Sequence, residues 1–180
     1  MTITKPVSLD TSELREKAHT LRAGMKVLLS GTVYTARDAA HKRFTALIGA
    51  GEDMPFPLDG AVIYYAGPTP AKPGKPIGSC GPTTSGRMDS FAPALLDLGL
   101  SAMIGKGERN AAVKEAIKRN AAVYFAAIGG AGALAAASIV SSEVIAFPEL
   151  GCESVKRLVF KDFPLIVAID SCGGDIFDRK

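Results

Sequence analysis

The fold of this chain is constrained most by a repeated pattern. A short apolar run is followed by a polar or glycine-rich turn and then by apolar residues at helical spacing. Four such units occur along the sequence, with apolar runs at residues 25–33, 61–66, 100–104 and 121–128. Strands that alternate with helices are typical of α/β proteins, in which functional groups concentrate where a strand passes into a helix. The sequence therefore predicts an α/β fold whose functional groups lie at these transitions.

Composition and length agree with one domain of this class. The 180 residues are 47% apolar and include 19 glycines but only 7% aromatic residues, so Ala, Val, Ile and Leu must build most of the core. A chain of this length buries a sizeable core, and no internal repeat or linker divides it. We therefore expect residues 1–180 to form a single compact domain.

Charge and hydropathy argue against several classes of protein. The formal net charge is +3, the 21 basic residues are spread along the chain and Trp is absent, which disfavours nucleic-acid binding. Residues 1–10 lack the apolar core of a signal peptide. The weakly polar run 121–140 contains Gly129-Gly130, which predicts a strand, a turn and a helix rather than a membrane span. We expect a cytoplasmic protein that binds neither nucleic acid nor membrane.

The cysteines and histidines do not predict a metal site. Cys80, Cys152 and Cys172 are an odd number without a C-x-x-C pair, so we interpret them as buried or incidental thiols rather than disulfide partners or cluster ligands. His19 and His41 have no metal-type residue at helical spacing, so we expect them on the surface or behind residues of the site, and not as metal ligands. No metal ligand is predicted on this chain.

Residues 81–89, with the sequence GPTTSGRMD, predict an anion site at a helix start. Thr84 or Ser85 can act as N-cap, and an amphipathic run that includes Leu95 follows. Backbone N–H groups, the positive end of the helix dipole and Arg87 would together attract a carboxylate or phosphate. The alternative is an ordinary hydroxyl cap before an ordinary helix.

Three further transitions carry polar groups or glycine. Arg37 and Asp38 stand where the first strand passes into a helix, although a solvated charge pair is equally typical there. Lys106 lies between two glycines, which let the backbone approach a ligand, but the full phosphate-loop pattern is missing. The turn at Gly129 lacks the glycine spacing of dinucleotide-binding proteins, so we interpret this turn as close packing of a helix on the sheet.

Three cations and a hydroxyl directed at one cleft would suit a small dicarboxylate. Such a site could assist proton removal next to a carboxylate, because fixed cations stabilise the charge that develops there. Expelling a hydroxyl from the neighbouring carbon calls for a Lewis acid, for which the chain offers no convincing ligands. The sequence therefore predicts half of an active site.

Five segments also carry a family resemblance. They stand in the order seen in class I, iron–sulfur-dependent fumarases and L-tartrate dehydratases, at residues 36–43, 81–89, 104–107, 127–130 and 147–151. The chain resembles their carboxy-terminal domain, which is a separate β subunit in two-subunit members. The resemblance covers essentially residues 3–175, and Cys152 departs from it because methionine is usual after Glu-Leu-Gly.

The resemblance implies a swivelling β/β/α domain that closes over an α subunit carrying a [4Fe-4S] cluster. Thr83 would be the base that takes the C3 proton of malate, and Arg87 and Lys106 would join it as catalytic residues. The implied substrate-binding residues are Arg37, Asp38, Thr84, Ser85 and Gly86. This chain would ligate no part of the cluster.

The function implied is that of a β subunit of a hydro-lyase that reversibly hydrates fumarate to (S)-malate. It would be active only with its α partner, in an α2β2-type assembly or around a homodimer of β chains. Two alternatives remain at this point: an L-tartrate dehydratase β subunit, since small changes decide such selectivity, or a non-catalytic subunit that binds dicarboxylates.

Overall fold

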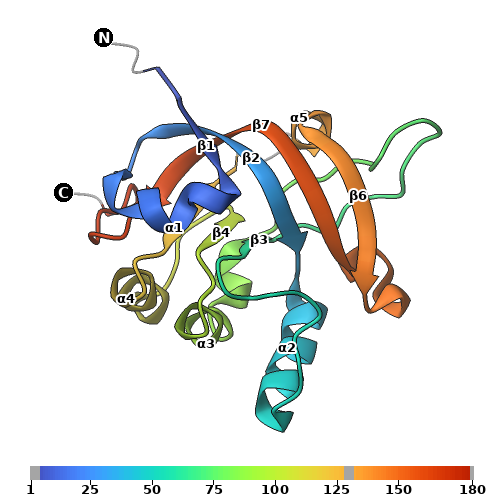
Figure 1. The fold of residues 1–180 in the computed structure, drawn as a ribbon, viewed down its shortest axis with the longest axis horizontal. Coiled ribbons are helices and arrows are strands. Elements are labelled where there is room, and N and C mark those ends of the chain that lie inside the picture. Colours follow the sequence, from blue (N-terminus) through green and yellow to red (C-terminus); the bar gives the residue numbers. More distant parts are fainter. Residues whose placement is uncertain (1–4, 128–131, 179–180) are drawn as a thin grey trace.

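A seven-stranded mixed sheet that closes on itself organises the fold (Figure 1). The computed structural model describes residues 5–127 and 132–178. β2 pairs with both β3 and β7, so β2, β3, β4, β5 and β7 form a closed ring, with β1 and β6 at its margins. In spatial order the strands are β1 (Val7–Asp10), β2 (Lys26–Thr35), β3 (Val62–Tyr64), β4 (Ala102–Gly105), β5 (Val123–Ala126), β7 (Val155–Ile169) and β6 (Ile139–Ala146).

The strands from β1 to β5 run parallel, and β7 runs antiparallel to its neighbours β2, β5 and β6. The carboxyl ends of β2, β3 and β4 therefore meet at one edge. The register places Thr35 beside Tyr64 and Tyr64 beside Ile104, so the three strands end almost level. Segments that follow these strands are consequently neighbours in space.

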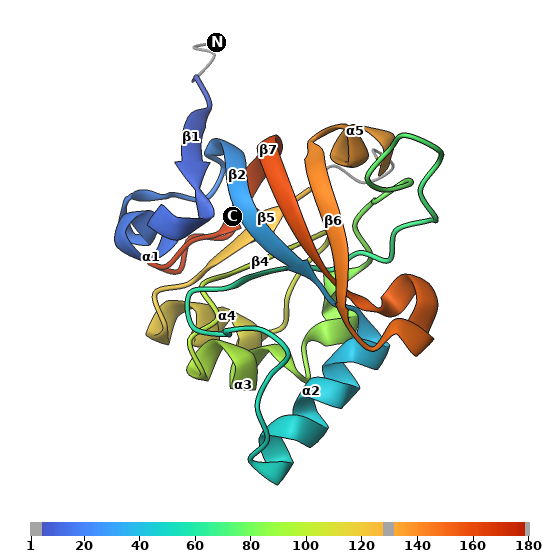
Figure 2. The same ribbon diagram turned by 45° about the vertical axis from the view of Figure 1, so that its right-hand side comes forward.

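Three helices cover one face of the sheet. They are α2 (Asp38–Ala50), α3 (Ala92–Asp97) and α4 (Ala111–Arg119). Figure 2 shows these helices below β4, while β2, β7 and β6 lie above it. The shorter α1 (Leu14–Lys17) follows β1, and α5 (Gly132–Ala137) precedes β6. The described residues also form four 3-10 turns, at Thr11–Glu13, Ala18–Thr20, Ser85–Met88 and Pro148–Glu153.

Alternation of side chains along the strands creates two cores. One core lies inside the sheet ring, where β3, β4 and β5 contribute Val62, Ile104 and Phe125. The other lies between the sheet and the helices, and alternate residues such as Ile63 and Met103 face it. The layers are thus sheet, sheet and helix, which confirms the predicted α/β class with a compact β/β/α arrangement; the boundaries at residues 1 and 180 stay a prediction.

Two strand predictions need correction. The pattern of residues 3–7 predicts a short strand; residues 3 and 4 lie outside the described residues, and β1 spans Val7–Asp10, where Asp10 caps the next turn. The apolar runs at residues 158–160 and 165–169, with Pro164 between them, predict two final strands, but both runs belong to β7. Pro164 lies opposite Leu28, and a register shift next to it, with Asp162 at φ 52°, bends the strand without ending it.

The helix expected after residues 81–89 is also different. Ser85–Met88 form a 3-10 turn, and α3 is a separate helix with Pro93 in its first turn. Thr84 is the N-cap of this turn but forms no side-chain cap, and the Ser85 hydroxyl bonds to the Lys106 N–H instead. In the described ranges, no helix has both the length and the apolar composition that crossing a membrane requires.

Candidate functional site

The structure brings the predicted site segments together at the carboxyl ends of three parallel strands. Arg37 and Asp38 follow β2, and the backbone N–H of Ala36 donates to the Tyr64 carbonyl at 3.1 Å. The Thr83 N–H donates to the Tyr65 carbonyl at 2.8 Å, and Thr84 forms a β-bridge with Lys106 after β4. The Gly129 turn lies outside the described residues.

Arg87 and Asp38 form an ion pair with two close contacts, of which only the one to Oδ1 has hydrogen-bond geometry. Arg87 Nε donates to Asp38 Oδ1 at 3.0 Å, and Arg87 Nη2 lies 2.9 Å from Asp38 Oδ2. The Arg87 side chain stays 51% exposed, so part of its guanidinium faces solvent. Asp38 thus orients Arg87, and direct contact between Asp38 and a substrate stays a prediction.

Arg37 is held by a carboxylate that sequence reasoning missed. Glu153 Oε1, from the turn Pro148–Glu153, lies 3.3 Å from Arg37 Nε. The pair lacks hydrogen-bond geometry, so this buried Nε has no hydrogen-bond partner among the described residues. The guanidinium also lies against Gly67, where an added Cβ would be 2.8 Å from Nη1. Only a glycine leaves Arg37 in this position.

Lys106 is fixed through its backbone. Its N–H donates to Ser85 Oγ at 3.0 Å, and its carbonyl accepts from the Ser85 N–H at 2.9 Å. Within the described ranges Lys106 forms no ion pair. A Cβ on Gly105 would lie 1.9 Å from Ser85 Oγ, so the close approach of the two loops depends on glycine at that position.

The predicted residues of the 83–87 turn differ in exposure. Thr84, Gly86 and Arg87 are exposed and Thr83 is half-buried, whereas Ser85 is fully buried. The Thr83 hydroxyl forms no hydrogen bond with any residue in the described part of the chain. Thr83 therefore presents a free hydroxyl, while the Ser85 hydroxyl bonds within the protein.

A buried ion pair behind the turn was also missed. Arg109 Nε donates to Asp89 Oδ1 at 2.6 Å, and the Asn110 N–H donates to Asp89 Oδ2 at 2.7 Å. The Arg109 side chain is 0% exposed and its guanidinium lies over the rings of Tyr65 and Tyr124. Asp89 belongs to the GPTTSGRMD motif, which was the available signal, but nothing in the sequence identified Arg109 as its partner.

His41 lies beneath the site rather than on the surface. It is fully buried against Tyr65 and Phe91, and its Nδ1 lies 2.8 Å from the Arg37 carbonyl oxygen. Because a carbonyl only accepts, Nδ1 carries the proton and donates. The surface interpretation was therefore wrong, whereas the expected position next to the site residues is correct.

Burial lowers the pKa of His41 from 6.5 to about 4, against a smaller raising effect of its bond to the Arg37 carbonyl. As the pH falls, the imidazole of His41 is therefore protonated in the unfolded chain at a higher pH than in the folded chain. His41 stabilises the fold fully above about pH 6.5, and this contribution, about 3 kcal/mol for such a shift, is lost between pH 6.5 and 4. Urea unfolding at pH 7 and pH 5 should show a smaller difference in the free energy of unfolding for His41→Leu than for the unmodified chain.

His19 offers the matched control, because it is exposed. His19→Gln should keep the full difference between the two pH values. An equal pH dependence in His41→Leu and the unmodified chain would show that His41 is not the group responsible.

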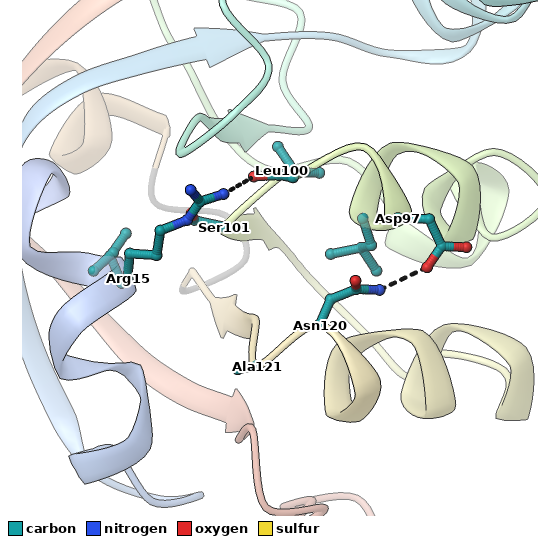
Figure 3. Close-up of a pocket in the computed structure, with 9 residues that line it drawn as sticks. Arg15, Asp97, Leu100, Ser101, Asn120 and Ala121 are labelled. Carbon is teal, nitrogen blue, oxygen red and sulfur yellow. Dashed lines mark hydrogen bonds between the residues drawn. The ribbon is translucent and has the colours of Figure 1, made fainter.

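A pocket of about 130 Å³ lies at the opposite edge of the sheet, before β4 and β5 (Figure 3). Three of its polar side chains, those of Arg15, Asp97 and Asn120, already have partners. Asn120 Nδ2 donates to Asp97 Oδ1 at 2.7 Å, and Arg15 Nη2 donates to the Gly99 carbonyl at 3.2 Å. The predicted site residues are absent from its lining, so this pocket is not the candidate site.

The cysteines do not offer a cluster site. Cys80 is buried, which raises the pKa of its thiol to about 12, whereas Cys152 and Cys172 are exposed. In the ranges 5–127 and 132–178, no three His, Cys, Asp or Glu side chains are grouped so that they could hold a metal ion. The donor set of the described residues therefore does not fit an iron–sulfur cluster.

The site as a whole combines three cations, two carboxylates and a free hydroxyl. Arg37 and Arg87 each have one carboxylate partner, and Lys106 has none in the described structure. The surplus charge is positive, which suits a small anion, and the paired arginines are held in place before it arrives.

Comparison with known proteins gives consistent matches. The family described as "Fumarase C-terminus" matches residues 2–180. The anaerobic class I fumarate hydratase of Escherichia coli strain K12 is 40% identical over 156 residues, which cover 86% of this chain and 28% of that protein. Fumarate hydratase 2 of Leishmania major is 37% identical over 169 residues, covering 93% and 30%.

A shorter relative matches over most of its own length. The putative L(+)-tartrate dehydratase subunit beta of Methanocaldococcus jannaschii is 38% identical over 165 residues, which cover 88% of this chain and 85% of that subunit. The chain thus spans less than a third of the two fumarate hydratases but most of this separate subunit.

Proposed function

The chain belongs to the fumarase C-terminus family, and we propose that it is the β subunit of a class I fumarate hydratase. The proposed reaction is the reversible hydration of fumarate to (S)-malate. One observation carries this proposal: Arg37, Thr83, Arg87 and Lys106, from three separate segments, lie at the carboxyl ends of adjacent parallel strands.

The cations of this site bind and orient the substrate in the proposal. Arg87, Arg37 and Lys106 bind the carboxylates of malate, and Asp38 and Glu153 keep the two arginines in place. The exposed Thr84 and Gly86 line the same turn, and Ser85 supports it from inside.

Thr83 takes the C3 proton of malate in the direction of dehydration. A threonine hydroxyl is intrinsically a very weak base, so this role needs the nearby cations to favour the alkoxide. Negative charge that develops on the neighbouring carboxylate is stabilised by the same cations. The half-buried position of Thr83 and its free hydroxyl support this assignment.

The partner in this proposal is an α subunit that carries the [4Fe-4S] cluster of the class I enzymes. Because the described residues of this chain do not fit a cluster, we assign no step of the reaction through it to this chain. We further propose that the domain closes over the α subunit, in an α2β2-type assembly or around a β homodimer in the cytoplasm. The name of the M. jannaschii relative, a subunit beta, supports a separate partner chain.

The selectivity test compares dehydration of (S)-malate and L-tartrate by the complex of this chain with its α partner, under anaerobic and iron-replete conditions. We expect higher kcat/KM for malate, since six of the relatives with most of this chain aligned are named fumarate hydratases. Higher kcat/KM for tartrate would instead identify a tartrate dehydratase. Binding of a dicarboxylate without turnover of either substrate would identify a non-catalytic subunit.

A further inference from the structure

One buried hydroxyl joins the Thr83 turn to the Lys106 loop. Tyr124 is fully buried in β5, and its Oη lies 2.9 Å from Ser85 Oγ and 2.8 Å from the Gly107 carbonyl oxygen. Ser85 Oγ in turn accepts from the Lys106 N–H at 3.0 Å. A single phenol thus contacts both segments that carry proposed catalytic residues.

Hydrogen-bonding capacity determines the direction of each bond in this chain. The Gly107 carbonyl only accepts, so Tyr124 donates its single proton there. The Lys106 N–H only donates, so Ser85 Oγ is its acceptor. The remaining contact therefore requires the Ser85 hydroxyl to donate to Tyr124 Oη. Since every proton is used within the protein, the Ser85 hydroxyl has none left to donate to a ligand.

The ring of Tyr124 is itself held from behind. The Arg109 guanidinium lies 5.0 Å from the Tyr124 ring centre and 5.3 Å from that of Tyr65, and Arg109 is fixed by its pair with Asp89. A buried cation over an aromatic face resists rotation and displacement of the ring. The Tyr124 hydroxyl is therefore a rigid point of attachment rather than an adaptable contact.

We propose that Tyr124 is a positioning residue, which sets the placement of Thr83 and Arg87 relative to Lys106 by joining their two loops through Ser85 and Gly107. This inference rests on the proposed function. Removing the hydroxyl leaves Ser85 without its acceptor and Gly107 without its donor, which frees the two loops to separate. Displacements of about 1 Å in such an arrangement can lower rates by about 100-fold.

The test is Tyr124→Phe in the full chain, studied with its α partner. Tyr64→Phe is the matched control, because Tyr64 is also fully buried and its hydroxyl donates to one carbonyl, that of Cys80, at 2.7 Å. We expect both variants to lose thermal stability, but only Tyr124→Phe to lower kcat, by about tenfold or more, with KM for fumarate changed less than kcat. Ser85→Ala breaks the same hydrogen-bond chain and should reproduce the kcat loss if Tyr124→Phe folds poorly.

Hydrogen–deuterium exchange of the Lys106 amide gives a readout that does not need activity. Tyr124→Phe should accelerate this exchange, and Tyr64→Phe should leave it unchanged. Equal kcat in the two variants, or unchanged Lys106 exchange in Tyr124→Phe, would overturn the positioning role. An inactive unmodified complex would refute the proposed function alone, and the exchange comparison would then still decide the role of Tyr124 in joining the loops.

Discussion

Replacement of Thr83 by alanine should lower kcat for malate dehydration by about 10²–10⁴-fold in the complex with the α partner, because the proton at C3 loses its base. The fold should survive, since the backbone N–H of Thr83 donates to the carbonyl of Tyr65, which follows β3, and alanine retains this N–H. KM should change little, because the arginines and Lys106 that bind the carboxylates are unaltered. Steady-state kinetics with purified complexes measure both constants.

Two variants bracket this result. Thr20 is distant from Thr83 in the sequence, and its exposed hydroxyl donates to the Lys17 carbonyl. Thr20→Ala removes this hydroxyl and should leave kcat unchanged. Thr83→Ser keeps a hydroxyl in place and should recover much of the lost rate. Near-normal turnover in Thr83→Ala would remove Thr83 from the mechanism and leave the cations as a binding site only.

The second large effect concerns stability. Asp89→Ala leaves the Arg109 guanidinium charged and fully buried without its carboxylate, and also removes the acceptor of the Asn110 N–H. Breaking a buried ion pair from one side costs about 3–5 kcal/mol. Urea unfolding at pH 7 should show a loss of this size in the free energy of unfolding.

Asp97 provides the comparison for this variant, because its ion pair with Arg119 is about half-exposed on both sides. Asp97→Ala should lose only a small fraction of the free energy lost by Asp89→Ala, since water solvates the arginine that remains. Similar losses in the two variants would mean that Arg109 gains solvent or a new partner when Asp89 is removed.

The location of the site could be predicted from the sequence because it depends on local patterns. Apolar runs followed by polar turns identified the ends of β2, β3 and β4, and parallel strands bring such ends together. In the structure, Arg37 and Asp38, the Thr83 turn and Lys106 lie next to one another at these strand ends. Roles in binding and catalysis remain proposals.

The partners of these residues could not be predicted, because pairing depends on contacts between distant segments. Glu153 reaches Arg37 from a turn that contains Gly151 at φ 60°, and no local pattern in the sequence connects the two. Three cations were expected to be directed at one cleft, and in the structure two of them are paired with carboxylates. The net positive charge of the site is therefore smaller than the three cations in the sequence motifs suggested.

Burial was the other property that local patterns misjudged. Ser85 follows the half-buried Thr83 and the exposed Thr84, but the 3-10 turn directs its side chain inward to Tyr124. His41 follows a charged pair at a helix start, yet the turn of α2 places it beneath Arg37. Similarly, Pro164 suggested a break that β7 accommodates next to a bulge.

Malate formation from fumarate, measured for this chain and its α partner separately and together, tests the central claim most directly. Both proteins would be kept anaerobic and iron-replete. The proposed half-site predicts turnover by the assembled complex and none by either chain alone. A complex that assembles with a fully loaded cluster yet forms no malate would contradict the claim that these strand ends complete the partner's active site.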